Sequence, residues 1–417
     1  MQFDVKENAH PTQSEVSTDR RNFVAGLWHG AFLAFGMALT DPTTVISAFV
    51  ANLTGSTVWV GGLSTVLTVA GALPQLFVAR WLEPKPRKLP YLLVAISLRV
   101  MSWGVLAWLI FTIGAQHPMT LAWIFVGMLA IFYAGGGLAN IPYTDIIGKV
   151  IPQNRRGAFF GGKGALAGPL SVGAALLARK ILAGVTYPNN YALLFGLAAV
   201  SLAIASLGFW AIREPLSTAA ENTMLSWHEY WHKLLSASLH MKELIGAQLL
   251  TGFSVMALPF YVVFAIQQRN APAEAVGWFL LMQVIGGALS NLIWARLVDH
   301  LGSRHMLFYC AIISTLTPIL AIVLSSLGWI TMLAVFFLAG AATNGRAVGF
   351  QSALLEIAPA TERSTYAGLN AVLILPVAFL SLAAGYFLQH WSYTALFLIT
   401  AIFVGTGALV IYRWATK

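Results

Sequence analysis

The stretch GALPQLFVARWLE, residues 71–83, recurs later in the chain as GALSNLIWARLVD, residues 287–299. At a constant offset of 216 positions, the two copies share Gly-Ala-Leu, an amide, a leucine, Ala-Arg and a final acid. A second pair of segments, IPQNRRG (151–157) and APATERS (358–364), shares a proline, an arginine and a small residue. Two matches in the same order predict an internal repeat, with two similar halves in one chain.

The composition predicts that this repeat folds in a membrane. Of the 417 residues, 58% are hydrophobic and only 9% are charged, whereas soluble domains carry roughly 25% charged residues. Apolar runs of about 20 residues, each long enough to cross a bilayer as a helix, recur from end to end. We therefore predict an all-α polytopic membrane protein with twelve transmembrane helices, near residues 23–50, 57–82, 89–114, 119–147, 157–183, 190–212, 243–267, 276–298, 305–325, 329–355, 364–387 and 393–413.

The repeat and the twelve spans together predict two pseudo-symmetric halves of six helices. Six crossings return the chain to its starting side, so the halves are parallel repeats. We expect a cytoplasmic tail (1–20), an N-terminal half (21–212), a cytoplasmic central loop (213–242) and a C-terminal half (243–417). Within that loop, SWHEYWHKLL (226–235) mixes aromatic and charged residues, which is typical of a helix lying at the membrane interface.

Basic residues are distributed unevenly between the predicted loops. Most of the 24 lie on one side of the predicted bundle, and the opposite side holds only Arg179, Lys180 and Arg269. By the positive-inside rule, we expect both termini to be cytoplasmic in a protein of the cell membrane. The net charge of +9 does not indicate nucleic-acid binding, because the basic residues are scattered among short loops.

The segment ARLVDHLGSRHML (295–307) resembles the loop signature of the major facilitator superfamily, Gly-x-Leu-x-Asp-x-x-Gly-Arg-Arg/Lys. Asp299, Gly302 and Arg304 match that signature, and Ala295 replaces its first glycine. The resemblance implies a secondary transporter that works by alternating access, with its substrate cavity between the two halves. It does not imply a particular substrate.

In the resembling family such loops close the cytoplasmic side, so we predict a cytoplasmic gate at these ends of the helices. The alternative is that the charges only set the topology and face water. An exposed ion pair contributes up to about 1 kcal/mol, which suits a contact that opens and closes. The predicted gate consists of Arg80, Glu83, Asp145, Arg156, Asp299, Gly302, Arg304, Glu356 and Arg363.

Three basic residues, Arg99, Lys163 and Arg346, fall inside predicted spans. Charges within a membrane are costly unless they face a wet cavity or a partner, so each is a candidate site residue. For Lys163 the alternative is snorkelling to the headgroups, and for Arg99 it is a structural ion pair or carbonyl contact. For Arg346 we expect substrate contact, because its helix lines the cavity in the resembling fold. The predicted substrate cavity comprises Arg346, Arg99, Lys163, Asn140, Asn344 and Gln283.

The stretch ALTDPTTVIS (38–47) places Asp41 and a proline inside the first span. An aspartate followed by proline is a helix-start signature, which predicts a break near Thr40. The same carboxylate, in a poorly hydrated place, is a candidate for proton coupling, because acids of this helix serve that purpose in some members of the resembling family. The alternatives are capping alone and direct binding of a cationic group. Three bases against one acid favour an anionic solute.

Enzymatic motifs such as HExxH, GxSxG and a P-loop are missing from the sequence, so we expect no enzyme, no cofactor and no metal. We expect a monomeric permease whose partners are a small organic solute, protons and the lipid bilayer. A lipid or lipid-linked flippase remains an alternative, as does a receptor or scaffold that does not transport. A drug/proton antiporter is a further alternative, because GALAGPLSVG (164–173) partly resembles the antiporter signature of the superfamily.

Overall fold

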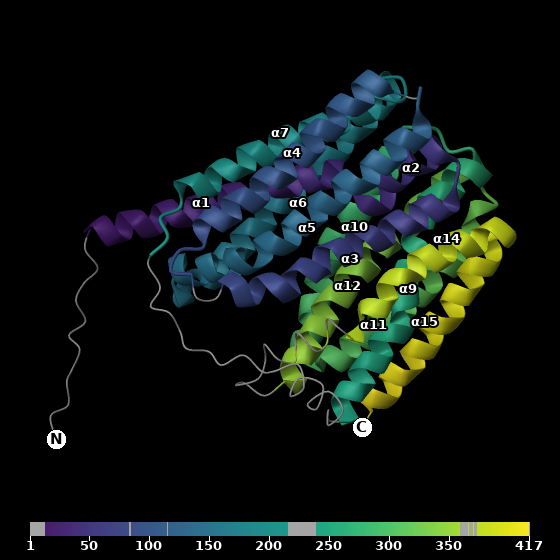
Figure 1. The fold of residues 1–417 in the computed structure, drawn as a ribbon. Coiled ribbons are helices and arrows are strands. Elements are labelled where there is room, and N and C mark those ends of the chain that lie inside the picture. The colour runs from purple at the N-terminus through teal and green to yellow at the C-terminus, as the bar shows by residue number, and fades with distance from the viewer. Residues whose placement is uncertain are drawn as a thin grey trace.

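The computed structural model describes residues 13–82, 85–114, 116–215, 239–358 and 373–416, together with Tyr366 and Asn370. The elements of these residues are all helical (Figure 1). The predicted interface helix at 226–235 lies outside them.

The N-terminal half contains six membrane-spanning segments, as predicted. The first is broken, and its parts are α1, a π-helical turn η1 and α2. The elements are α1 (Gln13–Leu39), η1 (Pro42–Ile46), α2 (Ser47–Thr54), α3 (Thr57–Leu82), α4 (Leu89–Ile113), α5 (Pro118–Val150), α6 (Arg156–Gly184) and α7 (Asn189–Ala211).

The C-terminal half follows the same plan. Its eleventh span is described only in part, as a short 3-10 turn η4 followed by α14. The elements are α9 (Leu239–Arg269), α10 (Ala275–Leu301), α11 (Ser303–Ser325), α12 (Met332–Ile357), η4 (Leu375–Phe379), α14 (Leu380–His390) and α15 (Tyr393–Ala415).

Eleven helices within the described ranges are long and apolar enough to cross a membrane. Large apolar side chains remain exposed on their outer faces, for example Trp108 (63%), Phe111 (68%) and Leu292 (66%). Such surface is stable in lipid and is uncommon on soluble monomers. The chain is therefore an integral membrane protein, and the prediction of an all-α polytopic fold is confirmed.

The internal repeat seen in the sequence is also a repeat of packing. In the N-terminal half α3 packs on α5 and α4 on α7, and in the C-terminal half α10 packs on α12 and α11 on α15. Glycine permits the closest of these contacts. A Cβ at Gly137 of α5 would lie 2.3 Å from the carbonyl oxygen of Gly71, and one at Gly340 of α12 would lie 2.0 Å from that of Gln283. Small residues allow helix backbones to approach in this way.

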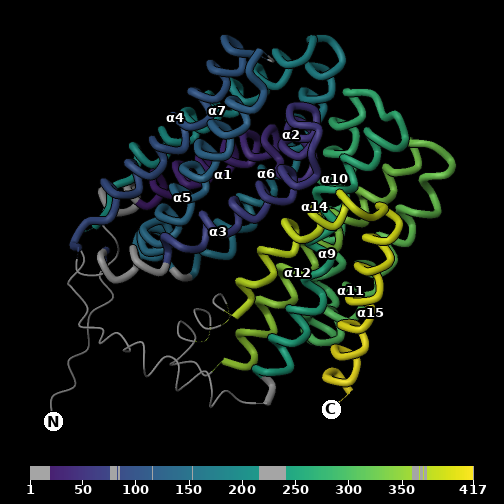
Figure 2. Tube along the Cα trace, turned by 45° about the vertical axis from the view of Figure 1, so that its right-hand side comes forward, coloured from purple at the N-terminus to yellow at the C-terminus, as the bar shows by residue number. Residues whose placement is uncertain are grey.

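The two halves touch mainly through α3 with α14 and α6 with α10. Figure 2 shows the halves meeting near α2, α10 and α14 and diverging toward their other ends. We call the diverging end the basic end, because it carries Lys88, Lys149, Arg156, Arg296 and Arg304.

Candidate functional site

A cavity of about 920 Å³ lies between the two halves. Its walls come from α1, α3, α4, α5, α6 and α7 on one side, and from α9, α12, η4 and α14 on the other. A second cavity of about 450 Å³ lies within the C-terminal half. Both are lined by Val255, Leu258, Arg346 and Ile374, so Arg346 lies at the boundary between them.

All three of the bases predicted to lie in the membrane, Arg99, Lys163 and Arg346, line the large cavity. Asn140 also lines it, and its side-chain amide donates to Oε1 of Gln75 at 3.2 Å. Among the described residues, no aspartate or glutamate lines either cavity. The wall is therefore positively charged, and a charged cleft with low-dielectric walls concentrates ions of the opposite sign.

Arg99 has no acidic or carbonyl partner within the described ranges, contrary to the structural alternative considered from the sequence. Its Nη2 donates to Sδ of Met37 at 3.5 Å, and its guanidinium carbon lies 4.5 Å from the centre of the Phe132 ring. Its Nε is buried and has no hydrogen-bond partner. A thioether is a weak acceptor, so most of the hydrogen-bonding capacity of this guanidinium is unused.

Lys163 and Arg346 have neutral partners. Nζ of Lys163 donates to the Tyr143 hydroxyl at 3.0 Å, which places the ammonium on the cavity wall. Nη1 of Arg346 donates to the Thr251 hydroxyl, and its guanidinium carbon lies 5.2 Å from the centre of the Phe350 ring. Neither base is neutralised by these contacts.

Two other predicted cavity residues have different surroundings. Asn344 packs against α10, with its side-chain nitrogen 2.7 Å from where a Cβ at Gly287 would lie. Gln283 bonds to the first span, as described below. Neither residue is among the described side chains that line the two cavities. His29 lines the cavity, but it is buried and one ring nitrogen bonds to the Ala205 carbonyl at 3.1 Å.

The predicted break in the first span is confirmed, and Asp41 is its cap. Oδ1 of Asp41 accepts from the backbone N–H of Thr43 and Thr44, both at 2.9 Å, and from their hydroxyls at 2.7 and 2.9 Å. Pro42 occupies the first helical position, where its missing N–H has no cost.

The second oxygen of Asp41 reaches the other half of the protein. Oδ2 accepts from Nε2 of Gln283 on α10 at 3.3 Å, and that amide also bonds to the Thr43 hydroxyl at 2.9 Å. The cap is therefore one of the contacts between the halves at the end opposite the basic end.

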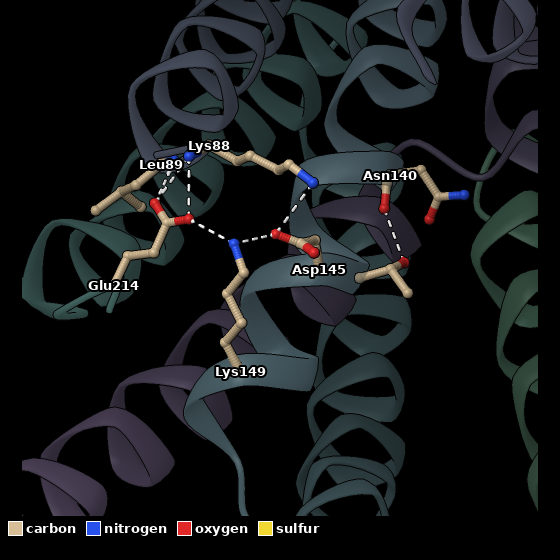
Figure 3. A network of polar contacts seen from close by, with 7 residues as sticks. Lys88, Leu89, Asn140, Asp145, Lys149 and Glu214 are labelled. Atoms are coloured by element: carbon tan, nitrogen blue, oxygen red, sulfur yellow. Dashed lines mark hydrogen bonds and ion pairs between the residues drawn. The ribbon is translucent and has the colours of Figure 1, made fainter. Parts of the chain in front are cut away.

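Figure 3 shows a charged network at the basic end of the N-terminal half. Asp145 of α5 pairs with Lys88 at 3.3 Å and with Lys149, which also pairs with Glu214 at 3.2 Å. Glu214 accepts the backbone N–H of Lys88 and Leu89 at 2.9 and 2.8 Å, so it caps the start of α4, where a negative charge is favourable. The side chain of Glu214 is only 2% exposed.

The hydrogen bonds and ion pairs of the described members of the predicted gate all lie within one half. Arg156 donates to the carbonyl oxygens of Gly148 and Ile151 within the N-terminal half. Glu356 accepts from Ser303, and Arg304 donates to the carbonyl of Trp414, within the C-terminal half. Gly302 has φ of 82° at the tight turn before α11, as its place in the signature requires. Glu83, Arg363 and the side chain of Arg80 lie outside the described residues.

The opposite end is closed by direct backbone contact. A Cβ at Gly61 of α3 would lie 2.0 Å from the Ser381 carbonyl oxygen of α14. The Thr57 hydroxyl donates to the Gly385 carbonyl at 2.8 Å. Arg179 of α6 lies 4.5 Å over the Trp278 ring of α10. The two halves are thus in contact at this end, whereas the described gate residues at the basic end do not bridge them.

Several cavity residues were not singled out from the sequence. In the smaller cavity, Nε2 of Gln248 donates to Oδ1 of Asn370 at 2.8 Å. The buried Thr251, which is not among the residues that line either cavity, accepts from Arg346 as described. Both Gln248 and Thr251 interrupt an apolar run, and that interruption is the sequence signal that marks them. Tyr133 lines the large cavity, and no spacing rule distinguishes it from the other aromatic residues of its helix.

Comparisons with known proteins agree with this architecture. Residues 244–417 match the model of the Major Facilitator Superfamily. Uncharacterized proteins of Mycobacterium tuberculosis and Mycobacterium bovis are 25% identical over 367 residues, covering 84% of this chain and 68% of theirs.

Solved structures extend the likeness over the chain. A bacterial homologue of the iron transporter ferroportin in its inward-facing state has a TM-score of 0.69 at 13% identity, covering 96% of this chain and 99% of its own. The xylose transporter XylE from E. coli, in a partially occluded inward-open conformation, has a TM-score of 0.68 at 11% identity, covering 95% and 98%. At these identities the likeness shows the fold alone.

Proposed function

We propose that this chain is a member of the major facilitator superfamily and a secondary transporter of a small organic anion that works by alternating access and is coupled to protons. The observation that carries the proposal is the cavity between the halves, which three bases line and which has no acid among its described lining residues. Such a wall attracts anions and repels cations. A metal cation is disfavoured for the same reason, and the described residues contain no group of three metal-binding side chains.

The arrangement of the halves supports alternating access. They touch at the end opposite the basic end, and the described gate residues at the basic end pair only within their own half. By the positive-inside rule the basic end is cytoplasmic, so the cavity opens to the cytoplasm. Both termini then lie in the cytoplasm, and the protein lies in the plasma membrane. Segments 21–212 and 243–417 then move as two bodies joined by the loop 213–242.

The proposed gate can be tested at Asp299. This residue is exposed and, among the described residues, has no ion-pair partner in the inward-open state. If it pairs across the halves when the cytoplasmic side closes, Asp299→Asn should favour the inward-open state by a few-fold, since an exposed pair contributes about 1 kcal/mol or less. Thiol labelling of the cavity from each side measures this ratio. Unchanged accessibility together with unchanged transport would show that Asp299 only sets the topology.

Solute flux into proteoliposomes tests the transport function, with Arg346→Lys as the first variant. Lysine keeps the charge but loses the planar fork that holds a carboxylate or phosphate through two hydrogen bonds. We expect the affinity for the transported anion to fall about tenfold or more, as expected for loss of a charge-assisted hydrogen bond. Equal transport kinetics in the wild type and in Arg346→Lys would show that Arg346 does not bind the solute through its planar fork. Its contacts to Thr251 and Phe350 would then be structural.

The same assay separates the other candidate functions. A transporter moves a soluble solute, a flippase moves only labelled lipid, and a receptor or scaffold moves neither. A drug/proton antiporter would exchange cationic or neutral drugs for protons, which the charge of the cavity wall opposes. Absence of flux for every anion, in vesicles that contain folded protein, would overturn the proposed function.

A further inference from the structure

Two bases of the large cavity, Arg99 and Arg346, come from opposite halves and lie at similar distances from the basic ends of their helices. Arg99 is the eleventh residue of α4, counted from Leu89 at the basic end, and Arg346 is eleven residues before Ile357 at the basic end of α12. At 1.5 Å per residue, each lies about 15–17 Å from that end of its helix. Lys163 of α6 adds a second base to the wall of the N-terminal half.

None of the three bases has an anionic partner within the described ranges. The hydrogen-bond acceptors are the Met37 thioether for Arg99, the Tyr143 hydroxyl for Lys163 and the Thr251 hydroxyl for Arg346. Arg99 also has a buried Nε without any partner. An uncompensated charge in a low-dielectric site is strongly destabilising, and a bound anion removes that cost. The cavity therefore has more positive charge than one monoanion can neutralise.

From these contacts, and resting on the proposed function, we propose that the transported solute is an organic dianion that is held by both halves at once. Arg99 and Lys163 bind negative charge on the N-terminal side, and Arg346 binds negative charge on the C-terminal side. Two chemistries fit: a dicarboxylate with two separate charges, and a phosphate monoester with both charges on one group. Guanidinium groups bind either kind of group through paired hydrogen bonds.

Thermal-shift measurements on the purified full chain test this proposal with defined probes. The dicarboxylates are succinate, glutarate and adipate, each compared with its monoamide at equal ionic strength and pH, and glycerol 3-phosphate represents the phosphate monoesters. A ligand that binds the folded state raises its melting temperature. We expect a clear rise with at least one of the dianions and a much smaller one with the corresponding monoanions.

Arg99→Gln and Arg346→Gln should each weaken binding of the stabilising dianion about tenfold or more, because each removes a charge-assisted contact. Lys180→Gln, an exposed base on α6 outside both cavities, is the matched control and should bind like the wild type. Without ligand, Arg99→Gln should melt at the wild-type temperature or above it, because it removes an unneutralised charge. A structural role for Arg99 would instead lower the melting temperature.

Three results would overturn the inference: no shift with any dianion of the set, monoamides as effective as the dicarboxylates, or full affinity in Arg99→Gln. These differ from failure of the proposed function. A monoanion that is transported with Arg346 required and Arg99 dispensable would leave the transport function standing and overturn only the two-sided dianion site.

Discussion

Replacing Gly61 with alanine is expected to reduce solute exchange about tenfold while the protein still folds and inserts. The added Cβ would lie 2.0 Å from the Ser381 carbonyl oxygen, a backbone atom that cannot rotate away. Helix α3 must then move off α14, which also strains the hydrogen bonds from Thr57 to Gly385 and from Thr65 to Ala378, now 2.8 and 2.7 Å. Overpacking of this kind costs about 1–3 kcal/mol, and about 1.4 kcal/mol shifts an equilibrium tenfold.

The added Cβ destabilises only the conformation in which α3 and α14 are in contact, because this contact joins the two halves at the closed end of the cavity. The accessibility of the cavity from the basic end therefore measures the change in the population of that conformation. Asn140 is an exposed residue of the cavity wall. Asn140→Cys reports access from the basic end, in a protein whose only natural cysteine, Cys310, is replaced by alanine. We expect the labelling of this cysteine from the basic end to decrease in Gly61→Ala.

The neighbouring glycine provides the matched control. A Cβ at Gly62 would lie 3.5 Å from Cδ1 of Leu382, an ordinary contact with a flexible side chain. Gly62→Ala should therefore label and transport like the wild type. If Gly61→Ala behaved in the same way, close contact between α3 and α14 would not be needed for the conformation that is open at the basic end.

Asp41→Asn is expected to remove proton-driven accumulation while leaving downhill exchange in place. Asparagine caps a helix nearly as well as aspartate, because its side-chain oxygen can accept the two backbone N–H groups, of Thr43 and Thr44, that Oδ1 of Asp41 accepts. It cannot bind and release a proton. With one coupled proton, a difference of one pH unit, about 1.4 kcal/mol, supports about tenfold accumulation of solute. The variant should show no accumulation above equilibrium.

A variant of Gln283 distinguishes loss of proton coupling from loss of the contact between Asp41 and α10. Gln283→Leu removes the bond between Asp41 and α10 but keeps the carboxylate, so it should still accumulate solute along a pH difference. Uptake of labelled solute into vesicles with imposed pH differences measures both variants. Normal accumulation by Asp41→Asn would mean that Asp41 is only a helix cap.

The sequence by itself determined the class of fold, the number of spans and the break in the first one. These properties are local, because about 20 apolar residues satisfy their own backbone hydrogen bonds as a helix in lipid. The cap at Asp41 is equally local, since its main partners are two and three residues away. The repeat at 71–83 and 287–299 could be predicted too, because equivalent helices pack through equivalent small residues.

Only the tertiary structure decided which polar side chains share the cavity. The same reasoning predicted Asn140, Asn344 and Gln283 as cavity residues, yet the structure places Asn140 on the wall, Asn344 against Gly287 and Gln283 beside Asp41. Side chains turn by about 100° per residue around a helix, so a small rotation of the whole helix changes what each one faces. That rotation is set by packing against helices distant in sequence, such as the contact between Asp41 and Gln283, 242 positions apart. For the same reason the sequence could not show that Arg99 has no acidic or carbonyl partner among the described residues.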